Sequence, residues 1–73
     1  MFAGAIVTVG GLTSAGHNFN TAADAKAKLS EIVNNPNNGY KTGYECYVID
    51  RTTHQIVSFA EVPLPKLEWQ DAK

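Results

Sequence analysis

The chain has one cysteine, no long apolar run and almost no excess of either charge in its 73 residues. The lone Cys46 cannot form an internal disulfide, which is typical of proteins that work in a reducing cytoplasm. A membrane-spanning helix needs about 20 successive apolar residues, and no stretch of the sequence approaches that length. The opening "MFAGAIVTV" also lacks the basic residues of a signal peptide. We therefore expect a cytoplasmic protein that makes no membrane contact.

The near-neutral charge argues against a dedicated nucleic-acid binder. Six basic and seven acidic residues give a formal net charge of −1, whereas proteins that bind DNA or RNA on their own usually carry a basic surface. A small nucleic-acid-binding accessory protein stays open as an alternative if the basic side chains converge on one face. The residues that would have to converge are Lys26, Lys28, Lys41, Arg51 and Lys66.

One helix is predicted between residues 22 and 33. Thr21 and Asp24 have the spacing of a capping pair, in which the threonine hydroxyl accepts a hydrogen bond from a backbone amide. Apolar side chains then recur every three or four residues, which predicts one buried face. These side chains are Ala22, Ala25, Leu29, Ile32 and Val33. The run "NNP" at 34–36 ends the helix, because asparagine tolerates a left-handed C-cap and proline cannot continue a helix.

Three strands are predicted at residues 5–9, 44–50 and 55–62, from their β-branched and aromatic content. The run "DRTTH" between the last two predicts a hairpin turn with His54 in the left-handed region. The order β-α-β-β predicts an α+β fold, a small two-layer sandwich with one helix packed on a three-stranded, mainly antiparallel sheet. Residues 1–62 form this single domain, and the Pro-containing residues 63–73 form an extended C-terminal tail.

Alternation along residues 44–50 separates the two faces of the predicted sheet. One set of side chains is Tyr44, Cys46 and Val48, and the opposite set is Glu45, Tyr47 and Ile49. Neither set is fully polar. The sheet therefore has one face for the helix and a second face that still carries aromatic and aliphatic groups.

The stretch "VGGLTSAGHNF" at 9–19 has the glycine spacing of a phosphate-binding loop between Gly11 and Gly16. Such a loop continues with lysine and then serine or threonine, but here His17 and Asn18 follow. We predict no nucleotide and no other cofactor. The loop that follows Gly10-Gly11 and runs to Phe19 is instead predicted to be mobile from Leu12 to Gly16 and to become ordered against a partner, with Leu12 and His17 as its contact side chains.

No residue pattern in the chain predicts catalysis or metal binding. Cys46, His17 and His54 have neither the spacing of metal ligands nor a third group that would orient a nucleophile and its base. The acidic residues near the end, Glu61, Glu68 and Asp71, leave two interpretations open. They serve as a solvated surface, or they form an acidic edge that attracts a partner segment bearing lysine or arginine.

Aromatic residues outnumber what so thin a core can bury. We expect Phe59 and one of Tyr44 or Tyr47 in the core, and the remaining aromatic groups, with Trp69 on the tail, in an exposed contact patch. Alternatively, Trp69 folds back over the open face of the sheet. The predicted partner-binding residues are Leu12, His17, Tyr44, Tyr47, Arg51, His54, Leu67 and Trp69.

The run "HNFNTAADAKAKLSEI" and the later "GYECYVIDRTTHQIVSF" give a capped, alanine-rich helix followed by a hairpin. This layout resembles small accessory proteins of tailed phages, and with the chain's size and charge it is similar to phage-encoded inhibitors of host proteins. The family includes the transcription inhibitor and antiterminator of a lytic Xanthomonas phage. The resemblance implies a non-enzymatic protein of the host cytoplasm that binds RNA polymerase near the N-terminal region of its largest subunit. It would inhibit transcription initiation and cause antitermination, sterically and allosterically.

Other functions remain open at this point. The chain could inhibit another host factor, such as a CRISPR effector, or contact nucleic acid near a partner. A small homo-oligomeric structural protein and a small enzyme are further alternatives. Our expectation is a monomer that binds a host protein and carries no cofactor.

Overall fold

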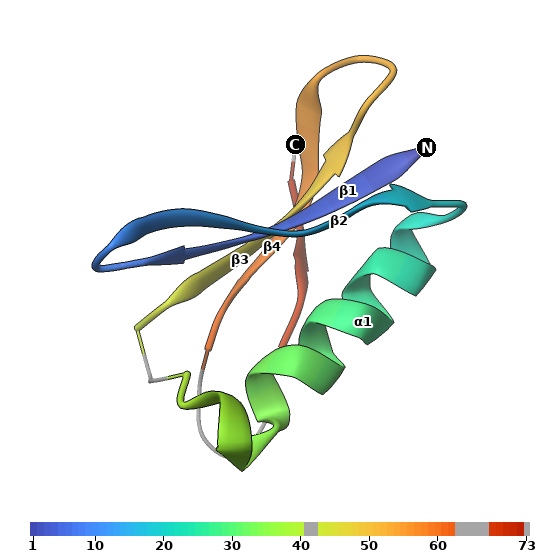
Figure 1. The fold of residues 1–73 in the computed structure, drawn as a ribbon. Coiled ribbons are helices and arrows are strands. Elements are labelled where there is room, and N and C mark those ends of the chain that lie inside the picture. Colours follow the sequence, from blue (N-terminus) through green and yellow to red (C-terminus); the bar gives the residue numbers. More distant parts are fainter. Residues whose placement is uncertain (41–42, 63–67, 73) are drawn as a thin grey trace.

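The computed structural model describes residues 1–40, 43–62 and 68–72. The elements follow the order β1 (Phe2–Thr8), β2 (Gly11–Phe19), α1 (Ala22–Asn34), the short 3-10 helix η1 (Pro36–Asn38), β3 (Glu45–Asp50), β4 (Gln55–Glu61) and β5 (Gln70–Asp71). The strands form one antiparallel sheet in the order β2-β1-β3-β4-β5. Helix α1 lies along one face of this sheet (Figure 1). The predicted α+β class is confirmed, but the sheet has five strands rather than three.

Strand β2 is the main departure from the predicted fold. Residues 11–19 were expected to form a loop that is mobile from Leu12 to Gly16, yet they pair with β1 from Thr8↔Gly11 to Phe2↔Phe19, with two irregularities in register. Gly11 follows the turn with a φ of 118°, a value that side-chain-bearing residues rarely adopt. The glycine pair at 10–11 therefore reverses the chain into a hairpin, so that β2 becomes an edge strand of the sheet.

Helix α1 forms as its sequence predicts. The Thr21 hydroxyl accepts a hydrogen bond from the Asp24 amide at 3.1 Å, which satisfies one of the free amides at the start of the helix. The expected left-handed cap at the other end does not occur, because Asn35 is extended with a φ of −77° and a ψ of 115°. Proline disfavours helical geometry in the residue before it, so Pro36 accounts for this difference.

The core lies between α1 and the sheet. Its buried side chains come from the helix and from β1, β3 and β4, and they are Ile6, Ala25, Leu29, Val33, Cys46, Val48, Ala60 and Val62. Gly4 of β1 allows Leu29 to approach closely, since a Cβ atom at Gly4 would lie 3.2 Å from the leucine side chain. Burying each large aliphatic side chain contributes about 1.5–3 kcal/mol, so this single layer supplies most of the stability of the fold.

The described part of the predicted tail adds to the sheet. Residues Gln70 and Asp71 pair with Phe59 and Ser58 of β4. The Trp69 indole nitrogen donates a hydrogen bond to the Ser30 hydroxyl of α1 at 3.1 Å. Trp69 therefore packs on the helix side of the sheet, not in an exposed patch and not over the open face.

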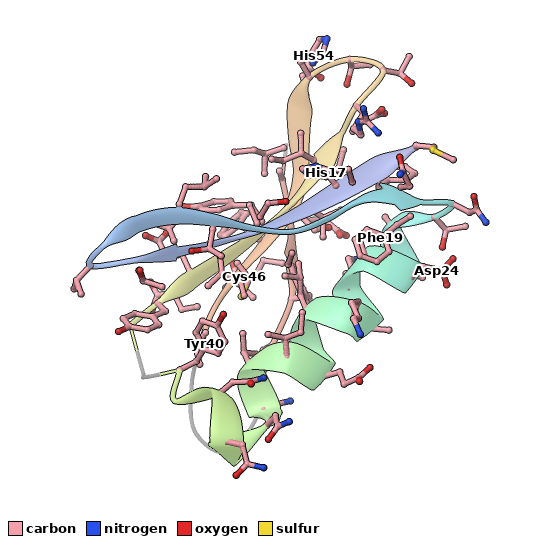
Figure 2. The ribbon with its side chains drawn as sticks, viewed as in Figure 1. His17, Phe19, Asp24, Tyr40, Cys46 and His54 are labelled. Carbon is pink, nitrogen blue, oxygen red and sulfur yellow. The ribbon has the colours of Figure 1, made fainter. Side chains whose placement is uncertain are left out.

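The β3–β4 turn has the predicted conformation. His54 has a φ of 58°, its amide donates to the Asp50 carbonyl at 2.8 Å, and the Thr52 amide donates to the Asp50 carboxylate at 2.8 Å. Figure 2 places His54 at the tip of this hairpin. In the part of the chain that the structure describes, no helix is both long and apolar enough to cross a membrane.

Candidate protein-binding face

The face of the sheet that points away from α1, which we call the open face, carries three cross-strand rows of side chains. The register places the side chains of β1, β2, β3, β4 and β5 in these rows. The first row is Leu12, Val7, Glu45 and Glu61; the second is Ser14, Ala5, Tyr47, Phe59 and Gln70; the third is Ala3, Ile49 and Ile56. Among the described residues, no helix or strand covers this face (Figure 1).

Aliphatic groups at two ends of the open face are accessible to solvent. Leu12 is 67% exposed and Ile56 is 47% exposed, which is unusual for large aliphatic side chains that could be buried. Between them, Val7, Tyr47 and Ile49 are half-buried. The open face is therefore a connected apolar surface and not a set of isolated exposed residues, and connected surfaces of this kind mark interaction sites.

Two aromatic rings lie at the centre of the open face. Tyr47 and Phe59 are directly paired across β3 and β4. The Tyr47 hydroxyl donates to the Glu45 carboxylate at 2.7 Å, and this hydrogen bond, with burial and the charges of Glu45 and Glu61, raises the pKa of Tyr47 above its ordinary value. Tyrosine at such a position supplies apolar area together with a hydrogen-bonding group, as interface hot spots do.

A shallow hollow of about 310 Å³ lies beside Phe59. Its other lining residues come from β3, β4 and the C-terminal segment, and they are Glu45, Glu61, Glu68 and Gln70. The hollow is therefore acidic, with an aromatic ring in its wall.

Two of the predicted partner-binding residues belong to the rows of the open face, and the ring of a third, His17, lies beside Ser14 of the second row. Leu12 lies at one end of the first row and Tyr47 at the centre of the second. Tyr44 is half-buried against the core, with its ring 6.2 Å from that of Tyr40 in an edge-to-face arrangement. Trp69 packs against the helix, and Leu67 lies outside the described residues. The predicted contact patch is thus divided between the two sides of the molecule.

His17 and Arg51 act together in holding the end of β2. The Arg51 guanidinium donates to the His17 carbonyl at 2.7 Å and to the Asn18 side-chain oxygen at 2.8 Å. The His17 ring nitrogen Nε2 lies 3.1 Å from the Ser14 hydroxyl. These contacts give both residues a structural role, whereas His54 is exposed at the far turn.

The prediction missed most of the aliphatic part of the open face. Phe59 was expected in the core, but its pairing with Tyr47 and Gln70 places it on the open face. Ile49 and Ile56 were not among the predicted partner-binding residues, although they pair directly with each other. Alternation along residues 44–50 did identify the face of Tyr47 and Ile49, and the same alternation applied to β4 would have found Phe59.

The lone cysteine and the acidic and histidine side chains are the candidates for a cluster among the described residues. Cys46 is fully buried on the helix side (Figure 2), and burial raises the pKa of its thiol to about 11. Within residues 1–40, 43–62 and 68–72, no three His, Cys, Asp or Glu side chains lie in a position to hold a metal ion.

Each of the described cations at 26, 28 and 51 contacts another group of the chain. Lys26 lies 3.7 Å from Asp71, and Lys28 lies 3.9 Å from Glu31. Arg51 is bound to the end of β2. Lys41 and Lys66, which the alternative also needs, lie outside the described residues.

Comparison of the chain with protein-family models, with curated protein sequences and with solved structures gave no match in any of the three. The resemblance to small phage inhibitors therefore stays a hypothesis that rests on the layout of the helix and the hairpin.

Proposed function

We propose that this chain is a non-enzymatic inhibitor that binds another protein through the open face of its sheet. The observation that supports this proposal is the apolar surface formed by Val7, Leu12, Tyr47, Ile49, Ile56 and Phe59, over which no described helix or strand lies. A domain of this size has little apolar surface to spare for its own stability. An apolar face left open is consistent with a binding partner that covers it.

The partner that we propose first is host RNA polymerase, in the cytoplasm of a phage-infected bacterium. The resemblance of the capped helix and the hairpin to phage-encoded inhibitors supports this choice, whereas the open face supports protein binding in general. Docking near the N-terminal region of the largest subunit would obstruct transcription initiation and cause antitermination, without any chemical step. A different host factor, such as a CRISPR effector, would use the same face.

Affinity capture from bacterial lysate, with mass spectrometry, tests the binding proposal when three matched variants accompany the wild type. Leu12→Asp and Ile56→Asp each place a charge on the open face. Val9→Asp makes the same kind of change at the tip of the β1–β2 turn, where Val9 is 97% exposed and outside the three rows. Retention of a partner should fall at least about tenfold for the first two, because a buried unpaired charge costs several kcal/mol.

The Val9→Asp control should retain the partner at the wild-type level. Equal retention by all four proteins, or no stoichiometric partner for the wild type, would contradict the proposal. Promoter-dependent transcription with purified RNA polymerase then tests the identity of the partner. Inhibition by wild type and Val9→Asp, but not by Ile56→Asp, is expected; transcription that none of them alters would refute polymerase as the target.

A further inference from the structure

The acidic hollow at one corner of the open face has a composition that identifies the chemistry of the group it receives. Glu45 and Glu61 are directly opposite each other on β3 and β4, and Glu68 and Gln70 complete the rim. Phe59 supplies the apolar wall. Among the described residues, no lysine or arginine lies within ion-pair distance of these three glutamates.

The pairing of Glu45 with Glu61 lowers the stability of the folded protein when no partner is bound. Like charges at directly opposite positions of an antiparallel pair repel each other. The Tyr47 hydroxyl donates to Glu45, which holds this carboxylate in place beside the rings without neutralising it. Within the described residues, this corner therefore carries negative charge that no cation balances, next to an apolar surface. The open face is thus complementary to a partner that is both basic and apolar.

Arginine fits this corner better than other basic groups. Its planar guanidinium can stack on an aromatic ring and donate two parallel hydrogen bonds to a carboxylate. Its hydrocarbon stem also packs on apolar surface. A hollow of about 310 Å³ is at the lower end of the size of small-ligand pockets, so it can admit a single side chain.

We propose that the hollow bounded by Glu45, Phe59 and Glu61 receives an arginine side chain of the partner protein, flanked in the partner by apolar residues that cover Tyr47 and Ile49. This inference rests on the proposed function, since it names the chemistry of the partner at the same face. The guanidinium lies against the Phe59 ring and donates to the carboxylates of Glu45 and Glu61. The apolar side chains of the open face beside the hollow contact the flanking residues of the same partner segment.

A peptide titration tests the inference without knowledge of the partner. The probe is acetyl-Val-Arg-Val-amide, added to isotope-labelled protein while backbone amide chemical shifts are recorded. We expect saturable shifts centred on Glu45, Phe59 and Glu61, with a dissociation constant of roughly 1 mM for so small a ligand. The peptide with citrulline in place of arginine has nearly the same shape but no charge, and it should cause no such shifts.

Variants that each replace one glutamate with the uncharged glutamine test whether the arginine peptide binds in the hollow. Glu45→Gln and Glu61→Gln should each raise the dissociation constant of the arginine peptide about three- to tenfold. Glu31→Gln removes one negative charge on α1, where Glu31 pairs with Lys28, and it should leave the affinity unchanged. A third peptide, acetyl-Val-Lys-Val-amide, tests the preference for arginine over lysine. The proposal would be overturned if the citrulline or lysine peptide bound as tightly as the arginine peptide, if the shifts were centred elsewhere, or if Glu45→Gln and Glu61→Gln left the affinity unchanged.

The arginine site and the proposed function can fail separately. A captured partner that is lost with Ile56→Asp but retained in full by Glu61→Gln overturns the arginine site and leaves the binding face standing. Binding of the arginine peptide at the corner, with no partner captured by the wild type, supports the arginine site and contradicts the proposed function.

Discussion

At the scale of single residues, Gly16 is the position in β2 where the fold tolerates no side chain. Its φ is 133°, and a Cβ atom there would lie 2.8 Å from the Phe19 ring, whereas Gly11 has a φ of 118° and open space around it. Gly16→Ala therefore introduces both backbone strain and a clash, but Gly11→Ala introduces strain alone.

We expect Gly11→Ala to lower the free energy of unfolding by about 1–3 kcal/mol, and Gly16→Ala to lower it by about 1–3 kcal/mol more. Urea denaturation of both variants measures the difference. Equal losses would mean that Phe19 does not pack against Gly16.

Cys46 reports on the integrity of the core. Because burial raises the pKa of its thiol from 9.0 to about 11, the reactive thiolate is scarce in the folded protein near neutral pH. Alkylation by iodoacetamide at pH 8 should be at least about tenfold slower in the folded than in the urea-unfolded protein.

The sign of the pH dependence follows from the same shift. The folded thiol keeps its proton while the unfolded thiol ionises, so the contribution of Cys46 to stability is complete below pH 9.0 and is lost as pH rises toward about 11. Cys46→Ala should remove this part of the alkaline decline. Rapid alkylation of the folded protein at pH 8 would contradict the buried position.

At the scale of elements, repulsion between Glu45 and Glu61 lowers the stability of the β3–β4 pair. Replacing Glu61 with glutamine removes the repulsion across the Glu45–Glu61 pair. We expect Glu61→Gln to raise the free energy of unfolding by about 0.2–1 kcal/mol, which is about 1–8 °C in Tm for a domain of this size. Thermal unfolding followed by circular dichroism measures this shift, with Glu31→Gln as the control. A lower Tm for Glu61→Gln would show that the corner is already neutralised in the free protein.

The C-terminal segment contacts α1 through Trp69, beside the Lys26–Asp71 ion pair. Its hydrogen bond to Ser30 spans 3.1 Å, and a single such bond is worth about 1 kcal/mol. Ser30→Ala should lower the free energy of unfolding by about that amount, and Trp69→Ala by about 2–3 kcal/mol, since half-buried apolar area is lost as well. Chemical denaturation measures both. No change for Trp69→Ala would mean that the C-terminal segment contributes nothing to the stability of the domain.

Local sequence signals were sufficient for α1 but not for β2. The Thr21 cap and the spacing of Ala25, Leu29 and Val33 are properties of adjacent turns, so they can be recognised without the rest of the fold. The residues of β2 are mainly small or polar, and small polar residues have low strand propensity. This segment becomes a strand because the glycine turn brings it against β1, which is a contact that propensity does not record.

In the candidate site, too, some features follow from local sequence and others depend on contacts between distant residues. The alternation that assigns Tyr47 to the open face is local, but its pairing with Phe59 depends on the register of β3 with β4. Phe59 was assigned to the core because large aromatic residues are usually buried. Likewise, the position of Trp69 depends on Ser30, which lies 39 residues earlier in the chain.

At the scale of the whole molecule, α1 covers one face of a five-stranded sheet, and no helix or strand among the described residues covers the other face (Figure 1). We expect a monomer in solution. A second copy could also cover the apolar rows, and sedimentation equilibrium at several concentrations distinguishes the two cases. A constant mass of 7.9 kDa is expected, whereas a dimer that Ile56→Asp dissociates would assign the open face to self-association.

The central claim is that the partner covers the open face and leaves the exposed side of α1 free. Site-specific photo-cross-linking in bacterial lysate tests it most directly, with the cross-linking amino acid placed at Ile56 in one protein and at Glu31 in a second. We predict one specific cross-linked protein from the Ile56 position and none from the Glu31 position. The same cross-linked protein from both positions, or from the Glu31 position alone, would contradict the account.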